Sequence, residues 1–190
     1  MSMPTFNFSL IVEGADLQGA EAQDALFEAG CDDATFGVVD GVQYAEFARE
    51  AGSYGQALTS ALAAIRDAVP GARVIHVEPD ELVTMSEIAE RLGRSRESIR
   101  LLVSGERGSG DFPHPVSHVR TRNRLWPWPE VLRWFATRYE DEFGAVLVRV
   151  PEDPSITAMV NGFIAYRRYF GSIDEEERRQ LEEAIEPATT

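Results

Sequence analysis

Two short stretches of this sequence hold the side chains that could do chemistry. The first contains Arg94, Ser95, Arg96, Glu97 and Arg100, and the second contains Arg120, Arg122 and Arg124. A guanidinium is a planar fork of N–H donors, which binds two acceptor atoms at once, as on a phosphate or on the edge of a guanine base. The two stretches therefore indicate recognition of a nucleic acid rather than the making or breaking of bonds.

No arrangement of residues typical of catalysis or of a metal site is found in the sequence. There are 3 histidines and 1 cysteine, and no recognisable pairing of a nucleophile with a base. His114 and His118 are the only close histidine pair, but Pro115 prevents a regular helix through them and no nearby cysteine completes a tetrahedral set. We therefore expect no enzyme activity, no metal and no cofactor.

The net charge of −14 would repel a polyanion if it were spread evenly. It is not: residues 1–83 carry −11, residues 84–135 carry +3 and residues 136–190 carry −6. Because salt screens exposed charges beyond about 10 Å, a basic middle segment can approach phosphates while the acidic flanks point elsewhere. We expect the acidic flanks to weaken non-specific binding, so that affinity depends on specific contacts.

Residues 84–103 have the pattern of two short helices joined by a tight turn. Thr84 with Glu87 forms a capping box, Gly93 suits the turn and Ser95 caps the second helix. Small and apolar residues stand where the helices must cross and pack, at Ile88, Ala89, Leu92, Ile99 and Leu102. This is the spacing of a helix-turn-helix, whose second helix places its N-terminal half against base edges in the major groove. The alternative interpretation is an ordinary pair of surface helices with arginines on the solvent side.

The residues after the helix pair continue this pattern. A glycine-rich loop is followed by two short extended pieces, Phe112–Val116 and Arg124–Trp128, and by a helix that we expect to start at Pro129. Together with the helix pair, these segments resemble a winged helix-turn-helix of the MerR and excisionase type. The resemblance implies that the wing tip, with its three arginines, contacts the DNA backbone or the minor groove. Of Trp126, Trp128 and Trp134, we expect at least two in the core rather than in a platform for unpaired bases.

A longer pattern supports the same interpretation. The segments "DALFEAGCDDATFG" and "ARVIHVEPDELVTMSEIAERLGRSRESIRLLV" resemble a family of small predicted DNA-binding proteins of GC-rich bacteria, over roughly residues 6–136. The resemblance implies double-stranded DNA as the partner and brings no catalytic chemistry with it.

Residues 1–82 are expected to form a ferredoxin-like βαββαβ domain, so that the whole chain has an α+β fold. A strand with alternating apolar residues comes first, then a helix capped by Asp16, a hairpin at Asp40–Gly41, a helix capped by Ser53 and a last strand over "ARVIHVEP". This architecture hosts many functions and names none. We expect the domain to sense a protein or small-molecule effector, or to assemble the protein.

Residues 83–137 would then be the winged helix-turn-helix domain and residues 138–190 a C-terminal helical segment. Apolar residues recur in that segment at helical spacing, at Ile156, Met159, Val160, Phe163, Ile164 and Tyr166, and a second helix is expected from Asp174. A face this apolar must be buried, either on the winged domain or against a second copy. We favour a homodimer, because operators read by helix-turn-helix proteins are commonly two-fold symmetric.

These features favour a sequence-specific DNA-binding transcriptional regulator. The alternative is an antitoxin-like or adaptor module whose acidic N-terminal domain engages a basic protein partner. The N-terminus lacks the basic region and the apolar core of a secretory signal, and no window has the length and apolarity of a membrane span. We therefore expect a cytoplasmic protein without a membrane partner.

Overall fold

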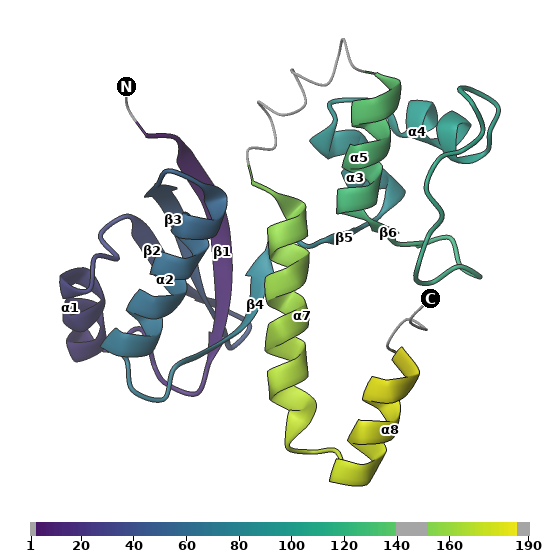
Figure 1. Cartoon of the computed structure of the whole chain (residues 1–190). Coiled ribbons are helices and arrows are strands. Elements are labelled where there is room, and N and C mark those ends of the chain that lie inside the picture. Colours follow the sequence, from purple (N-terminus) through teal and green to yellow (C-terminus); the bar gives the residue numbers. More distant parts are fainter. Residues whose placement is uncertain (1–2, 140–151, 186–190) are drawn as a thin grey trace.

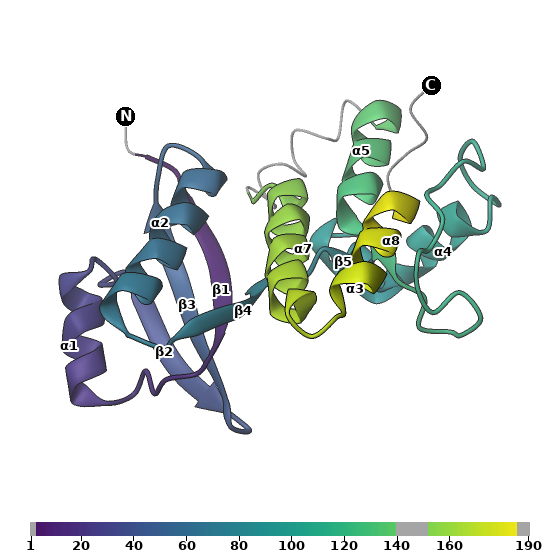
Figure 2. The ribbon, with the colours of Figure 1, turned by 60° about the horizontal axis from the view of Figure 1, so that its bottom comes forward.

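The computed structural model describes residues 3–139 and 152–185. Within these residues the chain is an α+β protein with seven helices, a four-stranded antiparallel sheet and a two-stranded sheet (Figure 1). The four-stranded sheet with its helices and the two-stranded sheet with its helices form two bodies, and the long helix α7 lies between them (Figures 1 and 2). None of the described helices combines the length and the apolarity that crossing a membrane requires. The segment "EDEFGAVLVRV", residues 140–150, which contains an apolar run, lies outside the described residues.

The first body has the order of elements that the sequence predicts. It comprises β1 (Thr5–Glu13), α1 (Ala20–Glu28), β2 (Ala34–Val39), β3 (Val42–Glu50), α2 (Tyr54–Ala68) and β4 (Arg73–Glu78). The strands lie in the order β2-β3-β1-β4, and every neighbouring pair is antiparallel. Alternate residues of β1 are buried, because one face of the sheet lies under α1 and α2 (Figure 2).

Two of the predicted turns and caps in this body are confirmed. Asp40 and Gly41 join β2 to β3 with φ of 51° and 82°, the left-handed values that a two-residue hairpin turn of this kind needs. The Ser53 hydroxyl accepts a hydrogen bond from the backbone N–H of Gln56 and so caps α2.

The predicted start of α1 at Asp16 is wrong. The helix begins at Ala20, and its N-cap residue, Gly19, makes no side-chain cap. The Asp16 carboxylate instead accepts from the N–H of Gln18, two residues on, within the loop. Leu17 enters the core from this loop and is fully buried, so its apolar side chain imitated the first turn of a helix.

A partly buried ion pair holds the loop between α1 and β2. Arg49 on β3 is 7% exposed, and its Nε and Nη2 each donate to one Asp33 oxygen at 2.8 Å. Nη2 also donates to the carbonyl of Gly30 at 2.6 Å. Asp33 thus neutralises the one arginine of this sheet that is buried.

The second body is built on a separate core. It comprises β5 (Leu82–Val83), α3 (Met85–Arg91), α4 (Arg96–Val103), β6 (Trp126–Pro127) and α5 (Trp128–Arg138). Trp126 and Trp128 lie at its centre and are each 1% exposed, as expected for at least two of the three tryptophans. The helix α5 begins one residue before the predicted Pro129, with Pro127 at the N-cap.

The inner face of the C-terminal segment packs on a surface that the sequence did not indicate. The helix α7 (Pro154–Phe170) lies along β4 and beside α2, so that Ile156, Val160 and Ile164 extend the core of the first body. The helix α8 (Glu175–Ile185) follows close to the predicted start at Asp174. Burial of the inner face of α7 is thus achieved within the chain, on the first sheet rather than on the second body.

Asn161 makes the polar contacts that hold α7 in this position. It is 7% exposed; its Oδ1 accepts from the N–H of Val77 at 2.8 Å and its Nδ2 donates to the carbonyl of Val77 at 3.0 Å. Nδ2 also donates to a carboxylate oxygen of Glu81 at 2.9 Å. A side-chain amide therefore continues the hydrogen bonding of β4 at an edge of the sheet where none of the described strands pairs.

We expect Asn161→Ala to lower the free energy of unfolding by about 2–4 kcal/mol, because it leaves a buried N–H and a buried C=O of β4 without partners. The measurement is urea unfolding followed by circular dichroism. Gly162→Ala is the matched control: this neighbour on α7 has open space around it, and alanine favours a helix by up to about 1 kcal/mol. Equal stability of Asn161→Ala and the wild type would contradict the role of Asn161.

Candidate nucleic-acid interface

The helix pair α3–α4 shows each local feature that the sequence predicts. Thr84 Oγ1 accepts from the N–H of Glu87, and the Glu87 carboxylate accepts from the N–H of Thr84, which completes the capping box. Gly93 has a φ of 63° in the turn, and the Ser95 hydroxyl accepts from the N–H of Ser98 at the start of α4. The apolar faces of both helices are buried against α5 and β6. The N-terminal end of α4 is therefore held in a fixed position relative to the core.

Arg96 is the first residue of α4 and its side chain is exposed. It makes no salt bridge to any residue in the described ranges. It lies one residue after the capping serine, where the positive end of the helix dipole adds to its own charge. Of the residues predicted on the first stretch, Arg96 is the one whose guanidinium is presented to solvent without a competing carboxylate.

Arg100, one turn further along α4, is held between two carboxylates. Its Nε donates to Glu97 at 3.0 Å and its Nη1 donates to Glu106 at 2.8 Å. These bonds raise the pKa of Arg100, with Glu106 the larger cause, and lower the pKa of both glutamates. A phosphate or a base that binds Arg100 must therefore displace at least one carboxylate. Glu106 lies in the loop after α4, and the sequence interpretation missed its role.

Arg94 and Ser95 contact the protein itself. The Arg94 guanidinium lies over the rings of Phe135 and Tyr139, at 5.2 Å and 5.0 Å from their centroids, and the side chain is half-buried. Ser95 uses its hydroxyl for the helix cap. The structure thus gives both residues a role in shaping the end of α4, beside any contact with a ligand.

The second stretch forms an exposed loop between Ser117 and Leu125, which we call the arginine loop. Arg120, Arg122 and Arg124 are all exposed and form no salt bridge within the described part of the chain. The loop is closed at its base by a bridge between Ser117 and Leu125, and within it Thr121 Oγ1 accepts from the N–H of Asn123. Three cations are therefore held on one short, hydrogen-bonded loop.

The extended pieces flanking this loop are shorter than predicted. Only Trp126–Pro127 forms a strand, β6, and its partner is β5, ahead of α3. The sequence interpretation missed β5, because two residues are too few to show a period. Pairing of β5 with β6 places the loop beside the helix pair.

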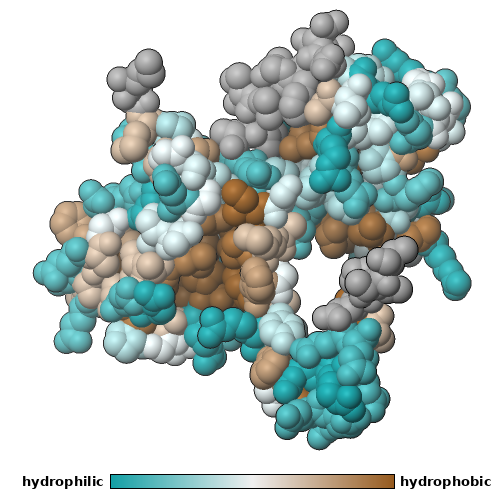
Figure 3. Space-filling model, in the orientation of Figure 1, coloured by the Kyte–Doolittle hydropathy of each residue, from teal (hydrophilic) through white to brown (hydrophobic). Residues whose placement is uncertain are grey.

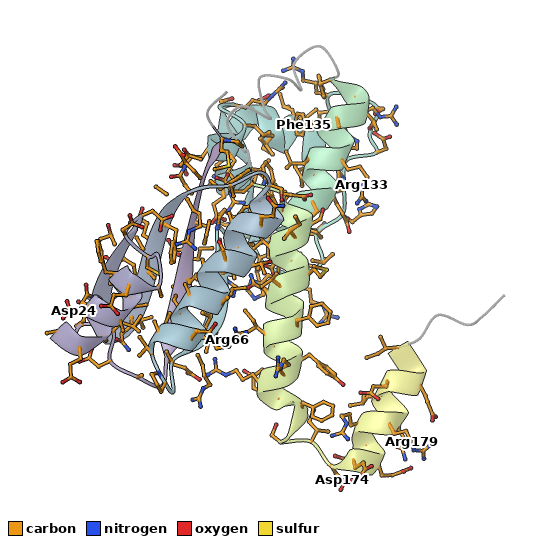
Figure 4. The ribbon with its side chains drawn as sticks, turned by 60° about the vertical axis from the view of Figure 1, so that its left-hand side comes forward. Asp24, Arg66, Arg133, Phe135, Asp174 and Arg179 are labelled. Carbon is orange, nitrogen blue, oxygen red and sulfur yellow. The ribbon has the colours of Figure 1, made fainter. Side chains whose placement is uncertain are left out.

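The helix α4, the loop after it and the arginine loop lie at the end of the molecule farthest from the four-stranded sheet (Figures 1 and 2). Two exposed arginines there were not singled out from the sequence: Arg107 in the glycine-rich loop and Arg133 on α5, which Figure 4 labels. The signal for Arg107 was its position between two glycines next to the helix pair. At the end of the molecule that points away from the acidic first body, arginines therefore outnumber carboxylates.

The tryptophans do not form a surface for stacking bases. Trp126 and Trp128 are buried, and Trp126 Nε1 donates to the carbonyl of Pro113 at 3.0 Å. Trp134 is half-buried and its Nε1 donates to Asp111 at 3.0 Å. Hydrogen bonds from Ser109, Trp134 and Arg138 lower the pKa of Asp111 to about 2, so this carboxylate fixes the glycine-rich loop to α5.

One group of side chains in the described residues has the types and spacing of metal ligands. His76, Asp80 and Glu81 offer ligand atoms within 4.8 Å of one another. These atoms already have partners: His76 Nε2 is bonded to Asp80, and Glu81 accepts from Asn161. The positive charge of Arg91 also acts on Asp80. The group therefore serves as a hydrogen-bonded junction between β4, α7 and α3. The pair His114 and His118 is not part of it, and His118 instead contacts the carbonyl of Asn123.

Comparison with known proteins adds no relative: the chain matches no protein-family model, no curated protein and no solved structure. The resemblances drawn from the sequence therefore stay predictions.

The junction generates a prediction about pH. The hydrogen bond to Asp80 raises the pKa of His76, and the same bond lowers the pKa of Asp80. A raised histidine pKa contributes stability that is complete below its ordinary value near 6.5 and is lost as the pH rises through the folded value. Between pH 6 and pH 8.5 we expect the free energy of unfolding to fall by up to about 1 kcal/mol more for the wild type than for His76→Gln. The difference is small because the His76–Asp80 pair is partly exposed. Urea unfolding across this range measures it, and parallel curves for the two proteins would refute it.

Proposed function

We propose that the protein is a sequence-specific DNA-binding transcriptional regulator, in which a ferredoxin-like domain is joined to a winged helix-turn-helix. One observation carries the proposal. A capped helix pair with a left-handed glycine turn presents the N-terminal end of α4, and an adjacent loop presents three arginines without salt bridges to described residues, both at the end away from the acidic sheet. The strand order β2-β3-β1-β4 with two helices on one face supports the ferredoxin-like assignment.

In this proposal α4 enters the major groove and the arginine loop is the wing. Arg96 reads base edges, and Arg120, Arg122 and Arg124 bind phosphates or the minor groove. Arg100 exchanges Glu106 for an acceptor on the DNA, at a cost that only a well-placed acceptor offsets. Glu97 and Glu106 repel the phosphates of any DNA. Only a sequence that also offers a matching base to Arg100 offsets this repulsion.

The experiment is a mobility-shift assay with DNA from upstream of the protein's own gene and with unrelated DNA of the same length. We expect Arg96→Ala to weaken binding to the specific fragment by about 1–3 kcal/mol, because a base contact is lost. Arg122→Ala should weaken both fragments alike and reduce the dependence on salt, because a phosphate contact is lost. Glu106→Gln should strengthen binding to both, because it releases Arg100.

Arg179→Ala on α8 is the matched control, since it removes an exposed arginine that is paired with Glu176 and Glu183 far from α4. It should leave binding unchanged. Binding that is unaffected by Arg96→Ala and Arg122→Ala would refute the proposed interface.

A second candidate function rests on the edge of the first sheet. The edge strand β2 and the start of β3 expose Val38, Val39 and Val42, at 48%, 60% and 50%. An exposed apolar edge of a sheet is a site where another chain can add a strand. An antitoxin-like or adaptor role, with a basic protein bound at this acidic body, would use that edge. The same mobility-shift assay separates the two functions, because an adaptor of this kind would not retard DNA.

We further propose that the protein is a homodimer and that a second copy covers the outer face of α7. Met159, Phe163 and Tyr166 lie on this face at 56%, 62% and 50% exposure, although the inner face of the same helix is packed on the sheet. Apolar residues at spacings of four and three form one stripe along a helix. Burying the stripe against its symmetry mate would bring two copies of α4 to a two-fold symmetric operator.

We expect light scattering after size exclusion to give twice the chain mass of 21.1 kDa for the wild type and a single chain mass for Phe163→Glu, because the substitution buries a charge in the interface. Gln180→Glu is the control, since it adds a carboxylate at an exposed polar position of α8 that bonds Glu176. A monomeric wild type, or a dimeric Phe163→Glu, would refute the arrangement.

A further inference from the structure

The helices α2 and α7 meet at their N-terminal ends and separate along their length. At the meeting point the hydroxyls of Tyr54 and Thr157 are 2.9 Å apart and both residues are buried. Ile156 packs next to Gly55 there. Further along, the helices leave a groove of about 830 Å³, which is bounded by α2, α7 and β4. Figure 3 shows apolar surface gathered between the two helices, with hydrophilic residues below it.

The floor of this groove is apolar. Its lining includes Leu62 and Ala63 from α2, Val74 and Ile75 from β4, and Ile164 from α7. All five are half-buried, so each still has surface that water reaches. A ligand with an apolar body would cover this surface, and the volume is in the range of pockets that hold small molecules.

The rim of the groove is basic. Four arginines line it: Arg66 from α2, Arg73 from β4, and Arg167 and Arg168 from α7. Figure 4 shows Arg66 near the C-terminal end of α2, beside α7. The one acidic residue in the lining is Glu13, which both Arg73 and Arg168 contact at 3.3 Å. Arg66 donates to its neighbour Asp67 at 2.6 Å and 2.8 Å. Arg167 forms no salt bridge with any residue that the structure describes.

This concentration of cations is opposite in sign to the net charge of the first body. Residues 1–83 have a net charge of −11, and they contain only three arginines, two of which line the groove. Two further arginines come from α7, which begins 76 residues after the end of β4 and is held there by Asn161. The folded structure thus brings arginines from the first body and from α7 together at the rim of the groove. Like charges held close together favour binding of an anion that neutralises them.

We propose that the groove binds a small amphipathic anion, with its apolar body on the floor and its carboxylate or phosphate head among the arginines. A guanidinium binds either head group through two parallel N–H···O bonds, and the apolar floor favours a ligand that also has an apolar body. The site is distinct from α4 and the arginine loop, which lie at the far end of the molecule (Figure 1). The proposal stands independently of DNA binding; if both hold, the ligand is the effector.

The test is isothermal titration of the full chain with decanoate, decyl phosphate and decanol, each below the concentration at which it forms micelles. We expect saturable binding at one site for at least one of the two anions, and binding of decanol that is at least about threefold weaker, because the alcohol has the same apolar body without the charge. Decanoate and decyl phosphate distinguish a carboxylate head from a phosphate head. No saturable binding of either anion, or equally tight binding of decanol, would overturn the proposal.

Variants locate the binding on the molecule. Arg167→Ala should weaken binding of the anion by about three- to fivefold, the range of a partly exposed ion pair, and should leave binding of decanol unchanged. Ala63→Leu should weaken all three compounds, because the larger side chain fills the floor. Arg179→Ala removes an arginine of α8 outside the groove and should change nothing. If Arg179→Ala weakens the anion as much as Arg167→Ala does, or if Ala63→Leu binds as the wild type while keeping its circular dichroism spectrum, the groove is not the site.

Discussion

The connection between β4 and α3 is the constraint on which the arrangement of the whole chain depends. Residues 76–81 are hydrogen-bonded to three helices. Asn161 of α7 bonds Val77 and Glu81, Trp128 of α5 donates its N–H to the carbonyl of Glu81 at 2.7 Å, and Arg91 of α3 donates to the carbonyl of Asp80. A short segment with so many polar contacts is stiff, because each backbone group that it satisfies would otherwise be left without a partner. The two bodies are therefore joined by a network of bonds rather than by a free linker.

This junction also explains how an acidic protein can present a basic end. The first body carries most of the negative charge, and the junction holds the second body so that α4 and the arginine loop point away from it (Figure 1). Within the second body, the carboxylates form salt bridges with particular arginines. Glu97 and Glu106 pair with Arg100, and Asp111 pairs with Arg138. Arg96 and the three loop arginines are presented to solvent. The distribution of ion pairs, more than the count of charges, decides which cations are open to a partner.

The helix α7 has three different environments along its surface. Its inner face completes the core of the first body, its outer face exposes an apolar stripe, and its C-terminal arginines line the groove beside α2. Because Asn161 bonds both β4 and Glu81, a ligand that moved α7 against α2 would act on the same contacts that hold the junction. The proposed ligand site, the proposed dimer and the proposed DNA interface would thus be linked through one helix, and linkage of this kind requires the ligand to bind two arrangements with different affinity.

Much of the local structure follows from the sequence by itself. The strand of alternating apolar residues at β1, the Asp40–Gly41 hairpin, the capping box at Thr84 and the cap at Ser95 are all interactions between residues close in the chain, so their spacing predicts them. The α+β class and the order of elements follow from the same local signals. Residues that imitate such a signal lead to errors, as Leu17 does: it is apolar at helical spacing and yet lies in a loop, because the core takes it from there.

The long-range partners of these elements depend on how the chain folds and have no local signal. The sequence shows that α7 has an apolar face but not that β4 would cover it, because hydrophobic burial has no direction and several apolar surfaces compete. It shows arginines at 94, 96 and 100 but not that Phe135 lies under the first and that Glu106 holds the last. The groove arginines come from segments far apart in the chain, so no spacing reveals them. Local hydrogen bonds are determined by neighbours in the sequence, whereas packing partners and ion pairs are determined by which surfaces meet when the chain folds.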